Sequence, residues 1–131
     1  MYSITKRIEI AAAHQLDLTY ESPCQRIHGH NWIITVEVSS EELDECGMVI
    51  DFKMLKQIME KVIKEKYDHR NISGLFDINP TAEIMASVIA ADIQNELCTI
   101  DLFINGEGLM SINVTKVTVQ ESEGNIACYI P

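Results

Sequence analysis

Three of the four histidines lie near the start of the chain, at His14, His28 and His30. Because His28 and His30 are two residues apart, their side chains point to the same side of an extended backbone. His14 can meet them if the two segments that carry these histidines pair as an antiparallel hairpin. A lone His-x-His spacing also occurs in packed or surface pairs, but His14 in register favours metal binding. Three neutral imidazoles with a fourth position left open are typical of catalytic Zn²⁺, which acidifies a bound hydroxyl or polarises a carbonyl.

Cys24 precedes His28 in a Pro-Cys-Gln-Arg segment that suits a loop rather than a helix or a central strand. A nearby cation favours the thiolate form of a cysteine, so this thiol is a candidate base or nucleophile. The alternative is a fourth zinc ligand that closes a structural site. The residue pattern alone leaves both roles open.

Two more ionisable groups lie at the ends of expected elements. Asp68 and His69 end an amphipathic helix, where the dipole favours a protonated imidazole and the carboxylate can orient it. Such a pair alone is more typical of a helix terminus than of a proton relay. Glu121 has the same odd parity as Val117 and Val119, so we expect its carboxylate to face the interior. A carboxylate there needs a partner, such as the bidentate donor edge of a pterin ring.

The elements that position these residues follow from two hydrophobic periods. Alternation of apolar and polar residues predicts strands over 2–12, 32–38, 111–121 and 125–130, with a turn at 123–125 between the last two. Helical spacing predicts one amphipathic helix over 51–66 and a second that ends near Leu97, with Asn79 as its N-cap and Pro80 as its first residue. Residues 99–110 are ambiguous. This order implies an α+β fold in which two helices cover one face of a four-stranded, largely antiparallel sheet.

Composition narrows the classes of protein. With 131 residues and 47% apolar content, the chain is expected to form one domain over 1–131 with its own core. It has neither the roughly 20 apolar residues of a membrane span nor an apolar N-terminal signal region, and its four cysteines form no regular framework, so we expect a cytoplasmic protein in a reducing compartment. A formal charge of −10 argues against a nucleic acid or an anionic membrane as partner and favours a small molecule.

Six motifs occur in a fixed order along the chain. They are Ala12-Ala13-His14, Cys24-Gln25-Arg26-Ile27-His28-Gly29-His30-Asn31, Ile50-Asp51-Phe52, Asp68-His69, Asn79-Pro80-Thr81-Ala82-Glu83 and Val119-Gln120-Glu121-Ser122. In order and spacing they resemble the 6-pyruvoyl-tetrahydropterin synthase family nearly from end to end. The resemblance implies the tunnelling fold, in which subunits join their sheets into a barrel, commonly as a homohexamer of two trimers with sites at subunit interfaces.

The resemblance also implies roles for individual residues. The three histidines named above would bind zinc, Cys24 would abstract a proton, and Asp68 with His69 would relay protons. Glu121 would anchor the pyrimidine edge of the pterin, with added contacts from Thr81 and Glu83, although a role in the first turn of the helix suits those two equally. The implied substrate is 7,8-dihydroneopterin triphosphate, whose internal redox rearrangement needs no nicotinamide or flavin. The chain has no G-x-G-x-x-G fingerprint, which agrees with this expectation.

The short Cys-x-x-x-His-Gly-His spacing resembles family members of the bacterial queuosine route. It favours a zinc-dependent carbon–carbon lyase that releases acetaldehyde and triphosphate and leaves 6-carboxy-5,6,7,8-tetrahydropterin. The alternatives are a phosphate lyase that forms a 6-pyruvoyl pterin, a non-catalytic assembly domain stabilised by zinc, and an enzyme resembling dihydroneopterin aldolase or GTP cyclohydrolase I, the aldolase case making the histidines incidental. Tyr67, in place of the usual Leu, and Ser122, in place of the usual Thr, depart from the family pattern.

Overall fold

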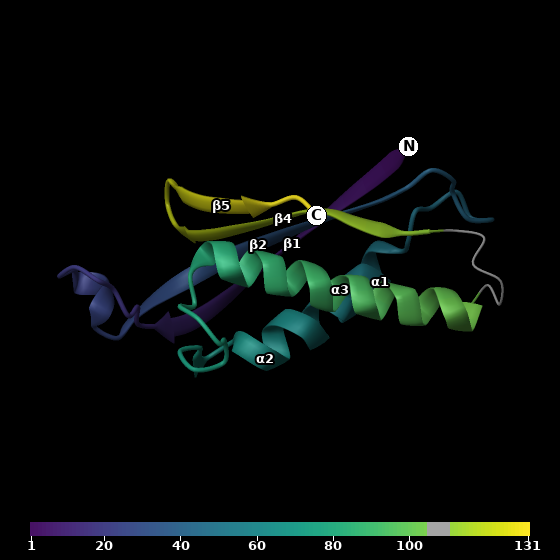
Figure 1. Cartoon of the computed structure of the whole chain (residues 1–131). Coiled ribbons are helices and arrows are strands. Elements are labelled where there is room, and N and C mark those ends of the chain that lie inside the picture. The colour runs from purple at the N-terminus through teal and green to yellow at the C-terminus, as the bar shows by residue number, and fades with distance from the viewer. Residues whose placement is uncertain (105–110) are drawn as a thin grey trace.

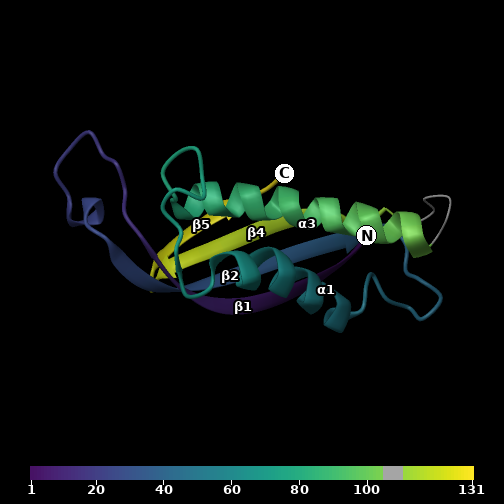
Figure 2. The same cartoon turned by 90° about the horizontal axis from the view of Figure 1, so that it is seen from below.

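The chain folds as a twisted sheet with helices along one of its faces (Figures 1 and 2). The computed structural model describes residues 1–104 and 111–131. The sheet has five strands in the order β3-β1-β2-β4-β5. These strands are β1 (Tyr2–His14), β2 (His28–Ser40), β3 (Arg70–Asn71), β4 (Asn113–Ser122) and β5 (Asn125–Tyr129).

The four longer strands confirm the predicted antiparallel sheet. β1 and β2 run further than the alternation alone indicated, whereas β4 begins two residues later than predicted and β5 ends one residue earlier. β1 and β2 pair over their whole length, from Tyr2 opposite Ser40 to His14 opposite His28. The short β3, which pairs in parallel with β1, was not predicted, because two residues are too few to show a period. It places the segment after the first helix at the edge of the sheet.

The helical segments are α1 (Phe52–Met59), a π-helical turn η2 (Glu60–Lys64), α2 (Glu65–Tyr67) and α3 (Ala82–Ile104). The first three follow one another without a break, so together they are the first predicted helix. A π-helical turn contains about one more residue than an α-helical turn. The extra residue in η2 keeps Leu55 and Tyr67 on the same, buried side of the helix. Both side chains are therefore fully buried, and the Tyr67 ring stacks on Phe76.

The predicted start of the second helix is wrong by two residues. Thr81 is the residue that caps α3, because its hydroxyl accepts a hydrogen bond from the Ile84 N–H at 3.2 Å. The Asn79 side chain instead bonds to Asp17 in a distant loop, so it is not available to cap the helix. α3 also extends through the first part of the ambiguous stretch, to Ile104, while 105–110 lie outside the described residues.

The core lies between the sheet and the helices. Alternate residues of β1 and β2 face it, as the parity predicted, and Ile10 pairs with the fully buried Trp32. Val117 and Val119 of β4 face the same core. No helix of the described ranges, 1–104 and 111–131, is long and apolar enough to cross a membrane. The predicted helix-covered face of the sheet thus carries both the core and, at the end of the β1–β2 pair, the histidines.

Candidate functional site

Three histidines meet where β1 ends and β2 begins. His14 is paired with His28 across the two strands, and His30 is paired with Ala12 two residues further along, so all three rings lie on the helix-covered face. The ring centroids are 4.5 Å apart for His14 and His28, 5.1 Å for His14 and His30, and 4.8 Å for His28 and His30. The hairpin that the sequence predicted therefore brings these imidazoles together.

Backbone carbonyls orient two of the rings. His14 Nδ1 lies 2.8 Å from the Pro80 carbonyl oxygen, and His28 Nδ1 lies 2.7 Å from that of Arg26. Because a carbonyl can only accept, each Nδ1 is assigned the proton and each Nε2 keeps its lone pair. Such second contacts are typical of histidines that ligate metals through the other ring nitrogen.

Glu121 completes the group. Its Oε1 lies 2.8 Å from His30 Nε2 and 3.7 Å from His14 Nε2. The β4–β5 register is irregular around this residue, which is a common way to aim a side chain into a site. One ligand atom each from His14, His28, His30 and Glu121 lies within 4.8 Å of all the others, and we call this group the His/Glu cluster.

The cluster fits a metal ion. His14 is only 1% exposed, and neither its Nε2 nor that of His30 has a hydrogen-bond partner of acceptable geometry within the described chain. Burial lowers the pKa of His30, which outweighs the opposing effect of the Glu121 carboxylate, so the neutral, ligating form of this imidazole is favoured. Buried lone pairs without donors that converge on one point, with an oxygen beside them, suit Zn²⁺.

Cys24 lies in the loop between β1 and β2, in the single 3₁₀ turn η1 (Pro23–Gln25). The Ser22 hydroxyl accepts from the Cys24 N–H at 3.2 Å, and the Cys24 carbonyl accepts from the Leu16 N–H at 2.7 Å. The thiol is half-buried and does not belong to the His/Glu cluster, where the fourth group is Glu121. Within the described residues, Cys24 is therefore not placed to close a four-ligand site with the three histidines.

Asp68 and His69 lie at the edge of β1 that faces away from β2. Asp68 Oδ1 accepts from the Ala11 N–H at 2.9 Å and lies 3.0 Å from His69 Nδ1. The Ala11 hydrogen bond is the main cause that lowers the pKa of Asp68, so its carboxylate stays charged beside the imidazole. His69 is 83% exposed and has a positive φ of 58°, an uncommon backbone conformation for a residue other than glycine.

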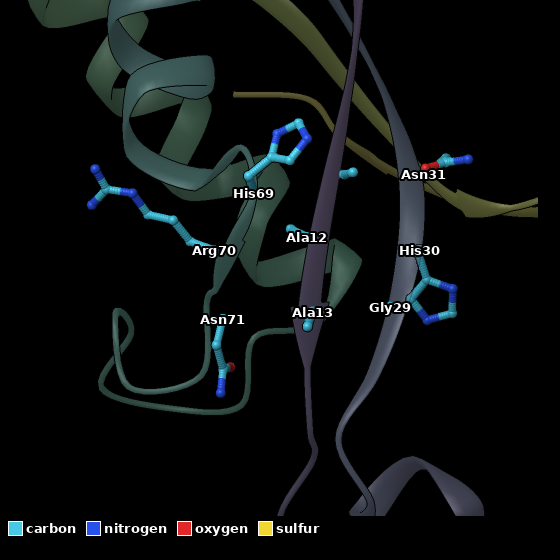
Figure 3. Close-up of a pocket in the computed structure, with 9 residues that line it drawn as sticks. Ala12, Ala13, Gly29, His30, Asn31, His69, Arg70 and Asn71 are labelled. Atoms are coloured by element: carbon cyan, nitrogen blue, oxygen red, sulfur yellow. The ribbon is translucent and has the colours of Figure 1, made fainter.

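Figure 3 shows that the rings of His69 and His30 lie on opposite sides of the β1–β2 pair, with the His30 ring pointing away from His69. Both residues line an open pocket of about 520 Å³, whose floor consists largely of small residues such as Ala13 and Gly29. Among the described residues, neither Asp68 nor His69 is one of the four whose ligand atoms converge in the His/Glu cluster.

The two remaining predicted residues lie at the start of α3. Glu83 and Glu121 both line a pocket of about 280 Å³ between this helix and the β4–β5 turn. Thr81 is the helix cap described above, so its hydroxyl already has a structural role. The two carboxylates therefore both offer hydrogen-bond acceptors to this pocket.

Two contributors were not predicted. Trp32 packs edge-on against His14 and His30, with ring centroids 4.9 and 5.3 Å away, and its Nε1–H donates to the Ala12 carbonyl at 3.1 Å. Its even parity, shared with His28 and His30, was a signal that could have found it. The Pro80 carbonyl that orients His14 had no such signal, because it comes from a segment 66 residues away.

Comparisons with known proteins identify relatives of this chain. The model of the family described as 6-pyruvoyl tetrahydropterin synthase matches residues 3–131. A Synechocystis protein named 6-carboxy-5,6,7,8-tetrahydropterin synthase is 35% identical over 99 residues, which cover 72% of this chain and 76% of that protein. A Rickettsia felis protein of the same name is 36% identical over 69 residues, and there the chain spans only 49% of the relative's length.

A solved structure shares the whole architecture. The 6-pyruvoyl tetrahydropterin synthase of Caenorhabditis elegans superimposes with a TM-score of 0.75 at 25% sequence identity, covering 99% of this chain and 95% of that one. The fold, including the predicted helix-covered sheet, is thus the fold of that enzyme.

Proposed function

Since the chain belongs to the 6-pyruvoyl tetrahydropterin synthase family, we propose that it converts 7,8-dihydroneopterin triphosphate and one water to 6-carboxy-5,6,7,8-tetrahydropterin, acetaldehyde and triphosphate. Relatives named for the 6-carboxy product, at 29% identity in Bacillus subtilis and 35% in Synechocystis, support this choice, as does the short spacing from Cys24 to His28. On this proposal the enzyme is a carbon–carbon lyase of the queuosine route that acts in the cytoplasm.

The observation that carries the proposal is the His/Glu cluster. His14, His28 and His30 would hold Zn²⁺, which when bound would polarise the hydroxyls on the substrate side chain. Apart from the nearby Glu121 carboxylate, the buried Nε2 atoms of His14 and His30 have no described partner, and neither makes a hydrogen bond of acceptable geometry, so holding a cation accounts for an otherwise costly arrangement. Glu121 would anchor the donor edge of the pterin within the pocket that it shares with Glu83.

Proton transfer would fall to the groups around this cluster. Cys24 Sγ would accept a proton from the substrate side chain, because the thiol lies in the loop next to the ligand His28 and is not itself needed as a ligand. Asp68 would hold the His69 ring through Nδ1, leaving Nε2 free to exchange a proton. Thr81 would support the pterin pocket through the start of α3 rather than through a direct bond.

We also propose that the complete site forms between copies of this single-domain chain, in a homohexamer whose sheets join into a barrel. The support is the separation of the relay pair from the His/Glu cluster within one chain (Figure 3). Mixing inactive Cys24→Ala and His69→Ala proteins under conditions that exchange subunits would then restore part of the activity, because some sites would receive both wild-type groups. If the mixture stays as inactive as its components, the shared site is wrong.

The test of the reaction is chromatography of the products formed from 7,8-dihydroneopterin triphosphate by zinc-loaded enzyme. Acetaldehyde and the 6-carboxy pterin in equal amounts are the expected result. A 6-pyruvoyl pterin with triphosphate and no acetaldehyde would instead assign the phosphate-lyase reaction that the C. elegans relative is named for. No conversion by protein with bound zinc would contradict both reactions.

A further inference from the structure

The side chain of Asn79 links two segments that lie far apart in the sequence. The Asp17 N–H donates to Asn79 Oδ1 at 2.8 Å, and Asn79 Nδ2 donates to the Asp17 carbonyl at 2.8 Å. These two bonds form a closed pair like the one between two strand residues. The carboxamide thus satisfies both backbone polar groups of one loop residue, Asp17, and each bond has an ordinary length.

Asp17 belongs to the same loop as Cys24. On one side of it the Leu16 N–H donates to the Cys24 carbonyl at 2.7 Å, and on the other the Leu18 carbonyl accepts from Gln25 Nε2 at 3.3 Å. The turn that carries the thiol is therefore bonded to both neighbours of Asp17. Hydrogen bonds that hold Asp17 in place therefore also restrain the turn that carries Cys24.

The residue that follows Asn79 holds a histidine of the His/Glu cluster. The Pro80 carbonyl accepts from His14 Nδ1 at 2.8 Å, and Pro80 is buried and has a fixed φ. The Thr81 N–H donates to the Asn79 carbonyl at 2.9 Å, which closes the segment onto the start of α3. Two consecutive residues therefore hold the thiol loop and a metal-binding histidine in one rigid frame.

We propose that Asn79 is a positioning residue that fixes Cys24 relative to the His/Glu cluster. The proposal rests on the proposed function, in which the thiol and the metal act on one substrate. Asn79 itself uses both polar groups of its side chain on Asp17, so it acts through the loop and not on the substrate. Without it, the loop keeps its internal bonds but loses its place beside the histidines.

The test compares Asn79→Ala, which removes both bonds, with Asn79→Asp, which keeps the acceptor and loses the donor. Asn113→Ala is the matched control, because that side chain also makes two hydrogen bonds, but both go to Ser111 in its own segment. The first readout is the rate of Cys24 alkylation at neutral pH, measured by peptide mass spectrometry with and without bound zinc. The ratio of the two rates reports how strongly the metal acts on the thiol, whatever its exposure.

We expect zinc to change the alkylation rate severalfold in the unsubstituted protein and in Asn113→Ala. The ratio should fall toward one in Asn79→Ala and to an intermediate value in Asn79→Asp, while zinc content stays near that of the unsubstituted protein. The second readout is turnover, for which kcat should fall about 10- to 100-fold with little change in KM, as for other groups that orient a reacting residue.

An Asn79→Ala ratio equal to that of Asn113→Ala overturns the proposal, and so does a ratio of one in the unsubstituted protein. If Asn79→Ala does not fold, Asn79→Asp decides by the same ratio. Because alkylation does not need the substrate, a protein that fails to convert 7,8-dihydroneopterin triphosphate would contradict the proposed function while the ratio still tests the role of Asn79.

Discussion

The structure predicts that two histidines of the His/Glu cluster differ sharply in what they contribute to the stability of the zinc-free fold. His14 is 1% exposed, its ring packs against Trp32, and its Nδ1–H satisfies the buried Pro80 carbonyl. His28 is half-buried, and its Nδ1 bonds to the carbonyl of Arg26 in the exposed loop just before it. We therefore expect both His14→Ala and His28→Ala to lose zinc, but only the first to lose much stability.

The magnitude follows from two losses at His14. Leaving the Pro80 carbonyl without a donor costs about 1–3 kcal/mol, and the cavity left by a buried ring adds about 1–2 kcal/mol if the neighbours partly collapse. A total near 3 kcal/mol, divided by an unfolding entropy of about 2.1 cal/mol/K for each of 131 residues, lowers Tm by about 11 °C. For His28→Ala the expected loss is about 0.5 kcal/mol, or roughly 2 °C, since water replaces the lost hydrogen bond.

Calorimetry of both variants after chelation, followed by zinc titration, measures these quantities. Excess zinc at about 100 times its dissociation constant should stabilise the unsubstituted protein by about 2.7 kcal/mol, equivalent to roughly 10 °C, and neither variant by a comparable amount. Equal losses of Tm in the two zinc-free variants would refute the reasoning from burial. A full zinc-dependent rise in Tm in both would refute the metal site itself.

Three further outcomes test the remaining groups. Cys24→Ala should keep near-stoichiometric zinc and its Tm but lose turnover by about 10²- to 10⁴-fold, whereas joint loss of metal and Tm would mean that the thiol is a ligand. Glu121→Gln should raise KM strongly, with roughly 2–5 kcal/mol less binding free energy, and an unchanged KM would contradict the anchor role. Because the folded pKa of Asp68 is lowered, its contribution is present above the unfolded value of about 3.9 and is lost as pH falls through the folded pKa. Asp68→Asn should therefore be about 1 kcal/mol less stable at pH 7, and chemical denaturation should show this gap narrowing as pH falls below about 3.9, while a gap that does not change with pH in that range would exclude the carboxylate as its source.

The spacing of apolar residues along the chain was sufficient to predict the regular strands and helices. Alternation in β1 and β2 set the parity of His14, His28 and His30, and an antiparallel pairing of these strands was enough to bring the three rings together. The same parity turned Glu121 toward the interior. These predictions succeeded because a strand fixes the direction of its side chains every second residue.

Contacts between irregular segments could not be predicted in this way. The bonds of Asn79 to Asp17 span 62 residues, and an Asn-Pro pair before a helix is locally indistinguishable from an N-cap with its first helical residue. His69 lies away from the cluster because β3, which follows it, pairs with the outer edge of β1. The hydrophobic period of the sequence does not predict this pairing. The strand patterns therefore predicted that the three histidines converge, while the hydrogen bonds that orient their rings depend on contacts between segments far apart in the sequence.

The position of Trp32 makes it a fluorescent probe of the His/Glu cluster. It is the only tryptophan of the chain, it is fully buried, and its ring lies edge-on to both His14 and His30. A cation held by these imidazoles would change the electrostatic surroundings of the indole ring, so we expect the fluorescence of this residue to change with the occupancy of the cluster. On the proposed function, the affinity of the cluster for zinc could then be titrated in dilute solution from the emission of Trp32, without a dye, a label or a substrate.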